Sequence, residues 1–295
     1  MRFTKMQAYG NDYVYISLID QHLNDIDIPK FAAFVSDRHK GIGSDGLILV
    51  CVSETADFKM RVFNPDGSEA EMCGNGLRSV GKFVYEKKYT EKKAFTVETL
   101  GGIKTVNLLV ENGKVENISA NIGKPVLESG KIPVTLTNKG NALVGYPYKI
   151  DDKTFSLTAL SLGNPHCGAE TDSDLGLDDP GIFDIEKYGA LLENAAFFPK
   201  KANIHFFSVI DKSHINMRSW ERNCGETLAC ATGCATVFYS AYLAGKVGET
   251  VFVKQRGGVI KIDYDRKSGE ITMTGRSETV FEGVIDKSAF DDYYA

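Results

Sequence analysis

The 295-residue sequence lacks several patterns that would each have indicated a class of protein. No stretch approaches the roughly 18 apolar residues that a membrane-spanning helix needs, and the N-terminus lacks the apolar run of a signal peptide. Lysine and arginine number 34 against 39 acidic residues, so the net charge of −5 gives no electrostatic basis for nucleic-acid binding. We therefore expect a cytoplasmic protein that binds neither membranes nor nucleic acid.

The six cysteines lack the spacings of common metal or redox motifs. There is no Cys-x-x-Cys pair, which argues against a thioredoxin-type or zinc-ribbon site. Cys224, Cys230 and Cys234 are spaced six and four residues apart, which fits no common zinc pattern. The glycine-rich segment 41–46 precedes an apolar strand and not a helix, so it does not indicate a dinucleotide site. No segment indicates pyridoxal phosphate or a metal, and we predict no cofactor.

What the sequence does contain is one cysteine-centred motif in two copies. Segment 60–76 aligns with segment 217–233 at an offset of 157. Five aligned pairs are identical: Met60/Met217, Arg61/Arg218, Glu69/Glu226, Cys73/Cys230 and Gly76/Gly233. Other matches keep the same order at offsets between 152 and 157, among them Gly10-Asn with Gly163-Asn. The pattern indicates duplication of a whole domain.

The duplication predicts an α+β fold of two pseudo-symmetric domains, each a mixed or antiparallel sheet wrapped around a central helix. We place the first domain at residues 1–123 plus 277–295, carrying Cys73, and the second at 124–276, carrying Cys230.

Two segments support this plan. The segment 231–246 is apolar on nearly every face, which is typical of a buried helix. The last segment, 280–295, has no counterpart between the halves and is expected to return to the first domain.

Each motif cysteine immediately precedes a predicted helix, where backbone N–H groups are unpaired. Such a helix end attracts anions and is expected to lower the pKa of a thiol. Gly74 and Asn75 on one side, and Ala231 and Thr232 on the other, let a carboxylate approach the backbone. If two such ends face each other across a domain cleft, they hold one carboxylate between two sulfurs. A thiolate and a thiol so placed can invert the carbon next to it, while the N–H donors stabilise the carbanion.

Other polar residues accompany this pair. Asn64 and Glu221 are equivalent positions, nine residues before their cysteines. Arg222 can bind a second carboxylate bidentately. His166 follows a proline that fixes its loop, although a structural role is equally open for it. Three asparagines lie in turns, where asparagine usually only forms the turn: Asn11, Asn164 and Asn203.

These motifs resemble the diaminopimelate epimerase family along essentially the whole chain. The resemblance rests on Lys5-Met6, Gly10–Asp12, Phe63–Glu69, Met72–Gly76, Leu162–His166, Trp220–Arg222 and Gly225–Cys230. It implies a small-molecule substrate and a cofactor-independent epimerase, which interconverts LL- and meso-diaminopimelate on the route to lysine and peptidoglycan. It also implies two pseudo-symmetric domains with the site in the cleft.

The resemblance further implies roles for individual residues. Cys73 and Cys230 would be the acid–base pair, tuned by His166 and Glu221, and Asn75 and Thr232 lie in the helix-end loops that hold the reacting carboxylate. The distal end of the substrate would be read by Asn11, Asn64, Asn164, Asn203, Glu221 and Arg222. The chain departs from the family pattern at Ala231 and Asn223, where glycine is frequent.

Alternatives remain open at this point. A racemase of another amino acid, such as histidine, would use the same thiols with a different distal set. Proline and hydroxyproline racemases share the thiols but lack the Trp-Glu-Arg segment. From another class, the cysteines would form a redox or metal-binding module. The sequence leaves the oligomeric state open, with a homodimer as one alternative.

Overall fold

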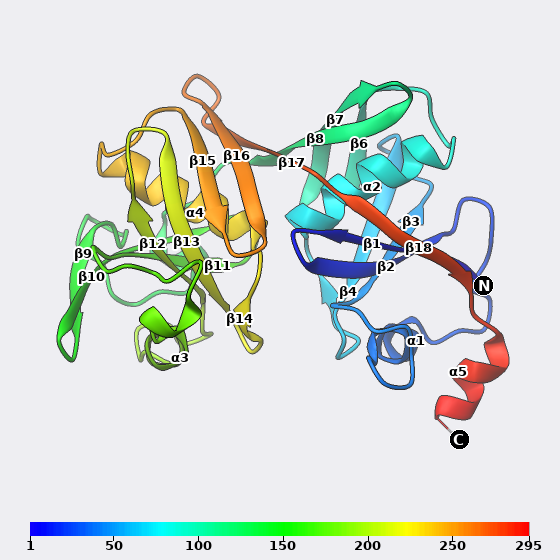
Figure 1. The fold of residues 1–295 in the computed structure, drawn as a ribbon, viewed down its shortest axis with the longest axis horizontal. Helices are drawn as coiled ribbons and strands as arrows, with labels where there is room; N and C mark the ends of the chain where they lie inside the picture. Colours follow the sequence, from blue (N-terminus) through cyan, green and yellow to red (C-terminus); the bar gives the residue numbers. More distant parts are fainter. Residues whose placement is uncertain (295) are drawn as a thin grey trace. The chain divides into compact units, whose positions relative to one another are not determined.

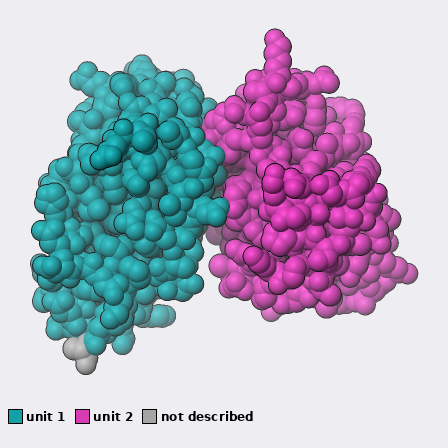
Figure 2. Space-filling model, turned by 180° about the vertical axis from the view of Figure 1, so that it is seen from behind, with its two compact units in different colours: residues 1–120, 275–295 teal, residues 121–274 magenta. Residues whose placement is uncertain are grey.

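A computed structural model describes residues 1–294 as two compact units. Unit 1 comprises Met1–Ala120 and Gly275–Ala295, and unit 2 comprises Asn121–Thr274 (Figure 2). The sequence-based limits, 1–123 with 277–295 and 124–276, stay a prediction, because a compact division of the chain does not test which segments fold independently. Within residues 1–294, no helix is long and apolar enough to cross a membrane.

Unit 1 is built on one mixed sheet (Figure 1). Its strands are β1 (Arg2–Ala8), β2 (Asn11–Ser17), β3 (Leu47–Cys51), β4 (Phe58–Phe63), β5 (Glu69–Ala70), β6 (Ala94–Thr99), β7 (Gly102–Glu111), β8 (Lys114–Gly123) and β18 (Glu278–Val284). Neighbours pair in the order β18–β1–β2–β3–β4–β6–β7–β8, with β5 added to β4. The pairs β2–β3 and β4–β6 are parallel, and the others are antiparallel.

Helix α2 (Gly74–Glu86) packs on one side of this sheet because Leu77, Val80 and Val84 recur on one helical face and are fully buried. They share a core with strand residues such as Ile48 and Val62. The opposite side is covered by α1 (Ile28–Ser36) and α5 (Lys287–Tyr293). These two helices meet through Phe31 and Phe290, whose rings lie 5.4 Å apart.

Unit 2 repeats the topology. Its strands are β9 (Tyr146–Ile150), β10 (Lys153–Ser161), β11 (Pro165–Glu170), β12 (Asn203–Val209), β13 (His214–Glu221), β14 (Gly225–Thr227), β15 (Thr250–Gln255), β16 (Gly258–Asp265) and β17 (Glu270–Gly275). They pair in the order β9–β10–β11–β12–β13–β15–β16–β17, with β14 on β13. As in unit 1, the third and fifth pairs of this order, β11–β12 and β13–β15, are parallel.

Helix α4 (Ala231–Leu243) is the counterpart of α2, and most of its residues are buried. Helix α3 (Ile185–Glu193) contributes to a second core with Phe155, Phe183 and Phe206. Two short 3₁₀ turns complete the unit, at Ser129–Lys131 and Pro180–Ile182.

The predicted α+β class with two duplicated sheets, each around a central helix, is confirmed. One sequence-based interpretation needs correction. The final segment does have a structural counterpart: β18 pairs antiparallel with β1, as β9 pairs antiparallel with β10. The two edge strands occupy equivalent places in their sheets. In the chain, however, β9 precedes the other strands of unit 2, whereas β18 follows the other strands of unit 1, so no single sequence offset aligns them.

Candidate active site

Cys73 is the N-cap of α2, with extended backbone angles of φ −132° and ψ 115°. Its Sγ accepts a hydrogen bond from the backbone N–H of Gly76 at 3.3 Å. This bond uses one of the unpaired donors of the first helical turn. The side chain is half-buried. The sulfur therefore lies at the positive end of the α2 dipole.

Asn11, at the start of β2, connects this sulfur to the neighbouring loop. Its Oδ1 accepts from Asn75 Nδ2 at 3.1 Å and lies 3.8 Å from Cys73 Sγ. Its own Nδ2 donates to Asp45 at 2.8 Å. Burial raises the pKa of Asp45, and Arg38 donates to this carboxylate at 2.9 Å. Because both ends of the Asn11 amide are bonded, its orientation is fixed.

Asn75 is held from the other side by a buried arginine. Arg78 is fully buried and donates to Asn75 Oδ1 at 2.6 Å. The arginine therefore places a positive charge behind the first turn of α2. Unit 1 thus brings together Cys73, Asn75 and Asn11 of the predicted site residues.

Cys230 is the N-cap of α4, with nearly the same backbone angles, φ −124° and ψ 109°. Its backbone N–H donates to Gln255 Oε1 at 2.9 Å, and its Sγ lies 3.6 Å from Thr232 Oγ1. Ala231 begins the helix and is outside the left-handed region, so the substitution of glycine there introduces no backbone strain. Asn223 does occupy that region, with φ 62°, which asparagine tolerates better than most residues.

The expectation that a helix N-terminus lowers the pKa of the thiol is wrong for Cys230. Burial raises this pKa well above its usual range, and the negative charge of Glu221 raises it further. The bonds from Thr232 and from the Gly233 backbone act in the opposite direction but do not outweigh burial. Cys230 is therefore a neutral thiol at pH 7, the form of an acid.

His166 lies at the start of β11 within a buried chain of hydrogen bonds. Its Nε2 lies 2.6 Å from Asn164 Oδ1, and its Nδ1 lies 2.9 Å from Nε2 of His205. The other ring nitrogen of His205 lies 2.9 Å from Ser219 Oγ. Burial lowers the pKa of His166 to about 3, helped by the charge of Arg222. Both Asn164 and His166 were predicted as site residues.

Asn203, at the start of β12, ties the His166 loop to the second motif. Its Nδ2 donates to the carbonyl of Pro165 at 3.0 Å, and its Oδ1 accepts from the backbone N–H of Arg222 at 3.0 Å. Glu221 accepts from Thr227 at 2.6 Å. Unit 2 thus groups Asn164, His166, Asn203 and Arg222, with Glu221 close enough to Cys230 to affect its pKa.

Asn64, the remaining predicted residue, lies in the turn after β4. Its Nδ2 donates to Ser68 Oγ at 2.9 Å. The turn itself is closed by the Asn64 backbone, whose N–H donates to the Ser68 carbonyl and whose carbonyl accepts from the Gly67 N–H, both at 2.9 Å. Its predicted contact with a substrate stays a prediction.

Sequence reasoning missed His205, Ser219 and Arg78: His205 contacts His166, Ser219 contacts His205, and Arg78 contacts Asn75. The offset of 157 carries a signal for the first two, since it aligns His205 with Ile48 and Ser219 with Val62. Two polar residues at positions that are apolar in the other copy of the repeat are a signal that the sequence alone contains.

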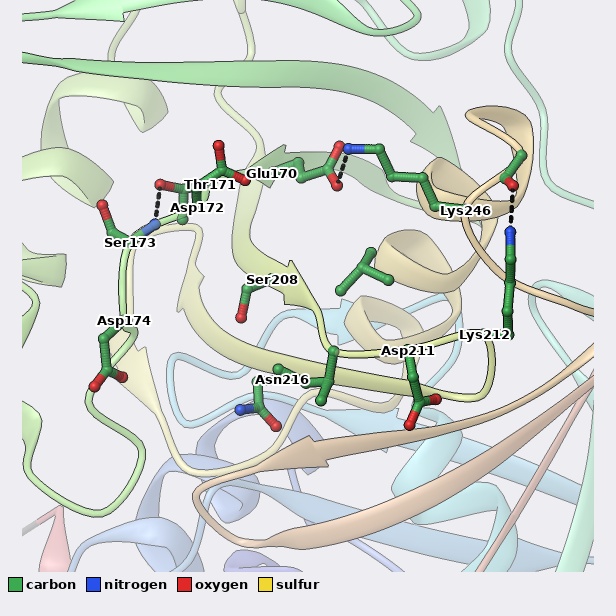
Figure 3. Close-up of a pocket in the computed structure, with 13 residues that line it drawn as sticks. Glu170, Thr171, Asp172, Ser173, Asp174, Ser208, Asp211, Lys212, Asn216 and Lys246 are labelled. Atoms are coloured by element: carbon green, nitrogen blue, oxygen red, sulfur yellow. Dashed lines mark hydrogen bonds and ion pairs between the residues drawn. The ribbon is translucent and has the colours of Figure 1, made fainter.

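A separate cavity of about 830 Å³ lies in unit 2 near the end of β11 and the loop after α4 (Figure 3). Its lysines are engaged: Lys246 pairs with Glu170 at 2.7 Å, and Lys212 donates to the carbonyl of Gly245 at 3.0 Å. None of the predicted site residues lines it. Because Cys230 is the N-cap of α4 and the cavity is lined by Gly245 and Lys246 beyond the last helical residue, Leu243, it lies at the end of the helix remote from the thiol. Within residues 1–294, no three His, Cys, Asp or Glu side chains are grouped to hold a metal ion.

Comparisons with known proteins cover nearly the whole chain. The family model described as diaminopimelate epimerase matches residues 3–128 and 158–280. A diaminopimelate epimerase of Methanococcus maripaludis is 46% identical over 286 residues, which are 97% of this chain and 100% of that protein. The enzyme of the same name from Acetivibrio thermocellus is 43% identical over 97% of this chain and 99% of its own length.

The fold has a wider distribution. The crystal structure of a probable proline racemase from Agrobacterium radiobacter superposes with a TM-score of 0.69 at 12% identity, over 98% of this chain and 94% of that one. At this identity the likeness concerns the fold alone.

Proposed function

Because the chain belongs to the diaminopimelate epimerase family, we propose that it interconverts LL- and meso-diaminopimelate by a two-base mechanism that uses its own thiols and no cofactor. The observation that carries this proposal is the equivalence of the two cysteines. Both are N-caps of the central helix of their unit, and their backbone angles differ by only a few degrees. A duplicated structural thiol would not need to keep the same position at the open end of a helix.

The proposed step is balanced without an external reagent. A thiolate removes the proton from the substrate carbon, and the thiol of the other cysteine donates a proton to the opposite face. The products are the inverted carbon, one thiol and one thiolate, so the roles exchange with each turnover. The mechanism requires both sulfurs to reach one substrate carbon.

The proposed roles of the remaining residues follow from charge and hydrogen bonding. Backbone N–H groups of the first turns of α2 and α4, with Asn75 and Thr232, would bind the reacting carboxylate. Arg222 would bind the distal carboxylate bidentately. The amides of Asn11, Asn64, Asn164 and Asn203, with Glu221, would complete the distal set. His166 and Glu221 would tune the thiols.

Solvent isotope exchange tests the proposal. Incubation of LL-diaminopimelate with the protein in deuterated water should give meso product that carries deuterium at the inverted carbon. Histidine, glutamate and proline, screened in parallel, should show no comparable exchange. If histidine exchanges instead, the chain is a racemase of a different substrate, and if none exchanges, the proposal is wrong.

We further propose that the protein is a cytoplasmic homodimer. Strand β18 pairs with β1 along one edge and exposes Val280, Phe281 and Val284 to 55%, 46% and 70%. An edge strand with exposed apolar side chains favours pairing with another chain. Analytical ultracentrifugation should give about twice the chain mass of 32.4 kDa, and Val284→Lys should shift the equilibrium toward monomer. A monomeric wild type would contradict this part of the proposal.

A further inference from the structure

The buried polar pair His205 and Ser219 of unit 2 stands where unit 1 has an apolar pair, and its hydrogen bonds continue through His166 to the partly exposed Asn164. In unit 1, Ile48 of β3 lies opposite Val62 of β4, and both belong to the core beneath α2. In unit 2, His205 of β12 lies opposite Ser219 of β13 in the same register. His205 is fully buried and Ser219 is 2% exposed. Burying polar groups costs free energy unless every hydrogen bond is satisfied, so unit 2 needs a continuous set of partners here that the apolar pair of unit 1 does not need.

Both buried residues sit against the start of the central helix. A Cβ atom on Gly76 of α2 would lie 2.5 Å from Ile48 Cδ1. A Cβ atom on the equivalent Gly233 of α4 would lie 2.5 Å from His205 Cε1 and 2.6 Å from its Nδ1. The imidazole is therefore packed directly beneath the turn that follows Cys230. Its ring has no room to rotate away.

The order of donors and acceptors along this chain follows from its end. Asn164 Oδ1 can only accept, so His166 Nε2 donates to it. Burial keeps His166 neutral, since it lowers the pKa of this ring to about 3, and the Nδ1 atom must then be an acceptor. The bond to His166 Nδ1 must come from His205 Nε2, which leaves His205 Nδ1 to accept from the Ser219 hydroxyl.

We infer that His205 is a positioning residue for the epimerase site of unit 2. Held by Ser219 and by the close approach of Gly233, it donates to His166 Nδ1 and fixes His166 in the tautomer with the proton on Nε2. In this tautomer His166 Nε2 donates to Asn164 Oδ1, so that Asn164 Nδ2 faces away from His166 and stays available as a donor to a substrate carboxylate. The assignment of Asn164 to substrate binding rests on the proposed function, whereas the tautomer does not.

The tautomer can be read directly in the full-length protein. Long-range ¹H–¹⁵N correlation spectra distinguish the protonated ring nitrogen of a neutral histidine, and His166→Gln assigns the signals by their loss. We expect the Nε2–H tautomer of His166 at pH 6 to 8 in the wild type. In His205→Ile/Ser219→Val, which copies the apolar pair of unit 1, this signal should change to a mixture or to the Nδ1–H form. A wild type in the Nδ1–H form, or an unchanged tautomer in the double variant, would overturn the inference.

Kinetics provide the second arm. His205→Gln keeps an N–H donor near the position of Nε2, so kcat/KM for diaminopimelate should stay within about threefold of wild type, while the double variant should lose at least tenfold. Phe206→Leu, a neighbouring core substitution in β12 that leaves these hydrogen bonds intact, should keep the wild-type kcat/KM. If the glutamine variant loses as much as the double variant, His205 acts by packing and the inference fails. A wild type without epimerase activity would refute the proposed function, and the spectra would still decide the tautomer.

Discussion

The two thiols have the same backbone setting and different chemical surroundings. Cys73 is half-buried, accepts a hydrogen bond from the first turn of its helix, and faces the amide of Asn11. Cys230 is 6% exposed, and burial with the charge of Glu221 raises its pKa. Duplication has kept the helix end and its cap, while the side chains around each sulfur have changed separately.

The difference extends beneath the helices. Ile48 and Val62 fill unit 1 where His205 and Ser219 fill unit 2, with identical strand pairing. Likewise, Arg222 of unit 2 aligns with Pro65 of unit 1 at the offset of 157. At these three aligned positions, the polar or charged residue is the one in unit 2. Inverting a carbon needs equivalent thiols, whereas the distal amino-acid end of the substrate lies to one side of that carbon and needs unequal recognition.

The largest expected effect tests the equivalence of the thiols. Cys73→Ala and Cys230→Ala should each lower kcat by about 10³-fold or more, because each removes one of the two proton-transfer groups. Epimerisation can be followed by chiral chromatography of the product, and Cys224→Ala serves as an exposed control that should keep wild-type turnover. Near-normal turnover in either site variant would show that one thiol suffices.

A second prediction concerns the residues beneath the helices. Gly233→Ala should cost about 3 kcal/mol of unfolding free energy and Gly76→Ala about 1 kcal/mol. The added methyl group meets a rigid imidazole in unit 2 but the mobile end of an isoleucine in unit 1. Urea unfolding measures both, with Gly130→Ala, whose methyl group would meet open space, as control. Equal costs would mean that His205 can yield as easily as Ile48.

The third prediction tests the charge present only in unit 2. Arg222→Ala should raise KM for diaminopimelate roughly thirtyfold, the equivalent of about 2 kcal/mol, through loss of a charged hydrogen-bond donor. KM for a monocarboxylate analogue should change far less. Arg266→Ala, whose side chain is 70% exposed, is the matched control. An equal rise for both substrates would place Arg222 away from the distal carboxylate.

The last prediction is a pH dependence of stability. His166 and His205 have folded-state pKa values below the unfolded value, because burial disfavours their charged forms. The unfolded chain therefore binds more protons, and stability falls as the pH drops from about 6.5 toward 3, by up to about 1.4 kcal/mol per pH unit for each histidine. His22 and His39 of unit 1 are exposed.

Urea unfolding between pH 4 and 6.5 measures this slope. The His205→Ile/Ser219→Val variant should lose the part of the pH slope that one histidine contributes, and His22→Gln should leave the slope unchanged. A double variant with an unaltered slope would indicate that His205 titrates normally in the folded state.

Much of this organisation could be predicted from the sequence because its signals are local. The helical spacing of Leu77, Val80 and Val84 and the position of each cysteine before a helix depend only on neighbouring residues. The offset of 157 then extended these local signals to two sheets of the same topology.

What the sequence could not provide depends on burial and on strand pairing. The first five residues of β12 are all buried, so the strand shows no alternation to indicate which face His205 occupies. Likewise, the sign of the pKa shift at Cys230 depends on the balance between desolvation and the helix end, which only the surrounding packing determines.

The pairing of β18 with β1 has a consequence for synthesis of the chain. Unit 2 is one uninterrupted stretch, and all its strands are made before β18. Unit 1 holds both the first and the last strands, so its sheet stays open at β1 until translation has passed the whole of unit 2. Domains usually fold in order from the N-terminus. Here the strands of unit 2 are all available first, and unit 1 can complete its sheet only when the C-terminal strand β18 has been made.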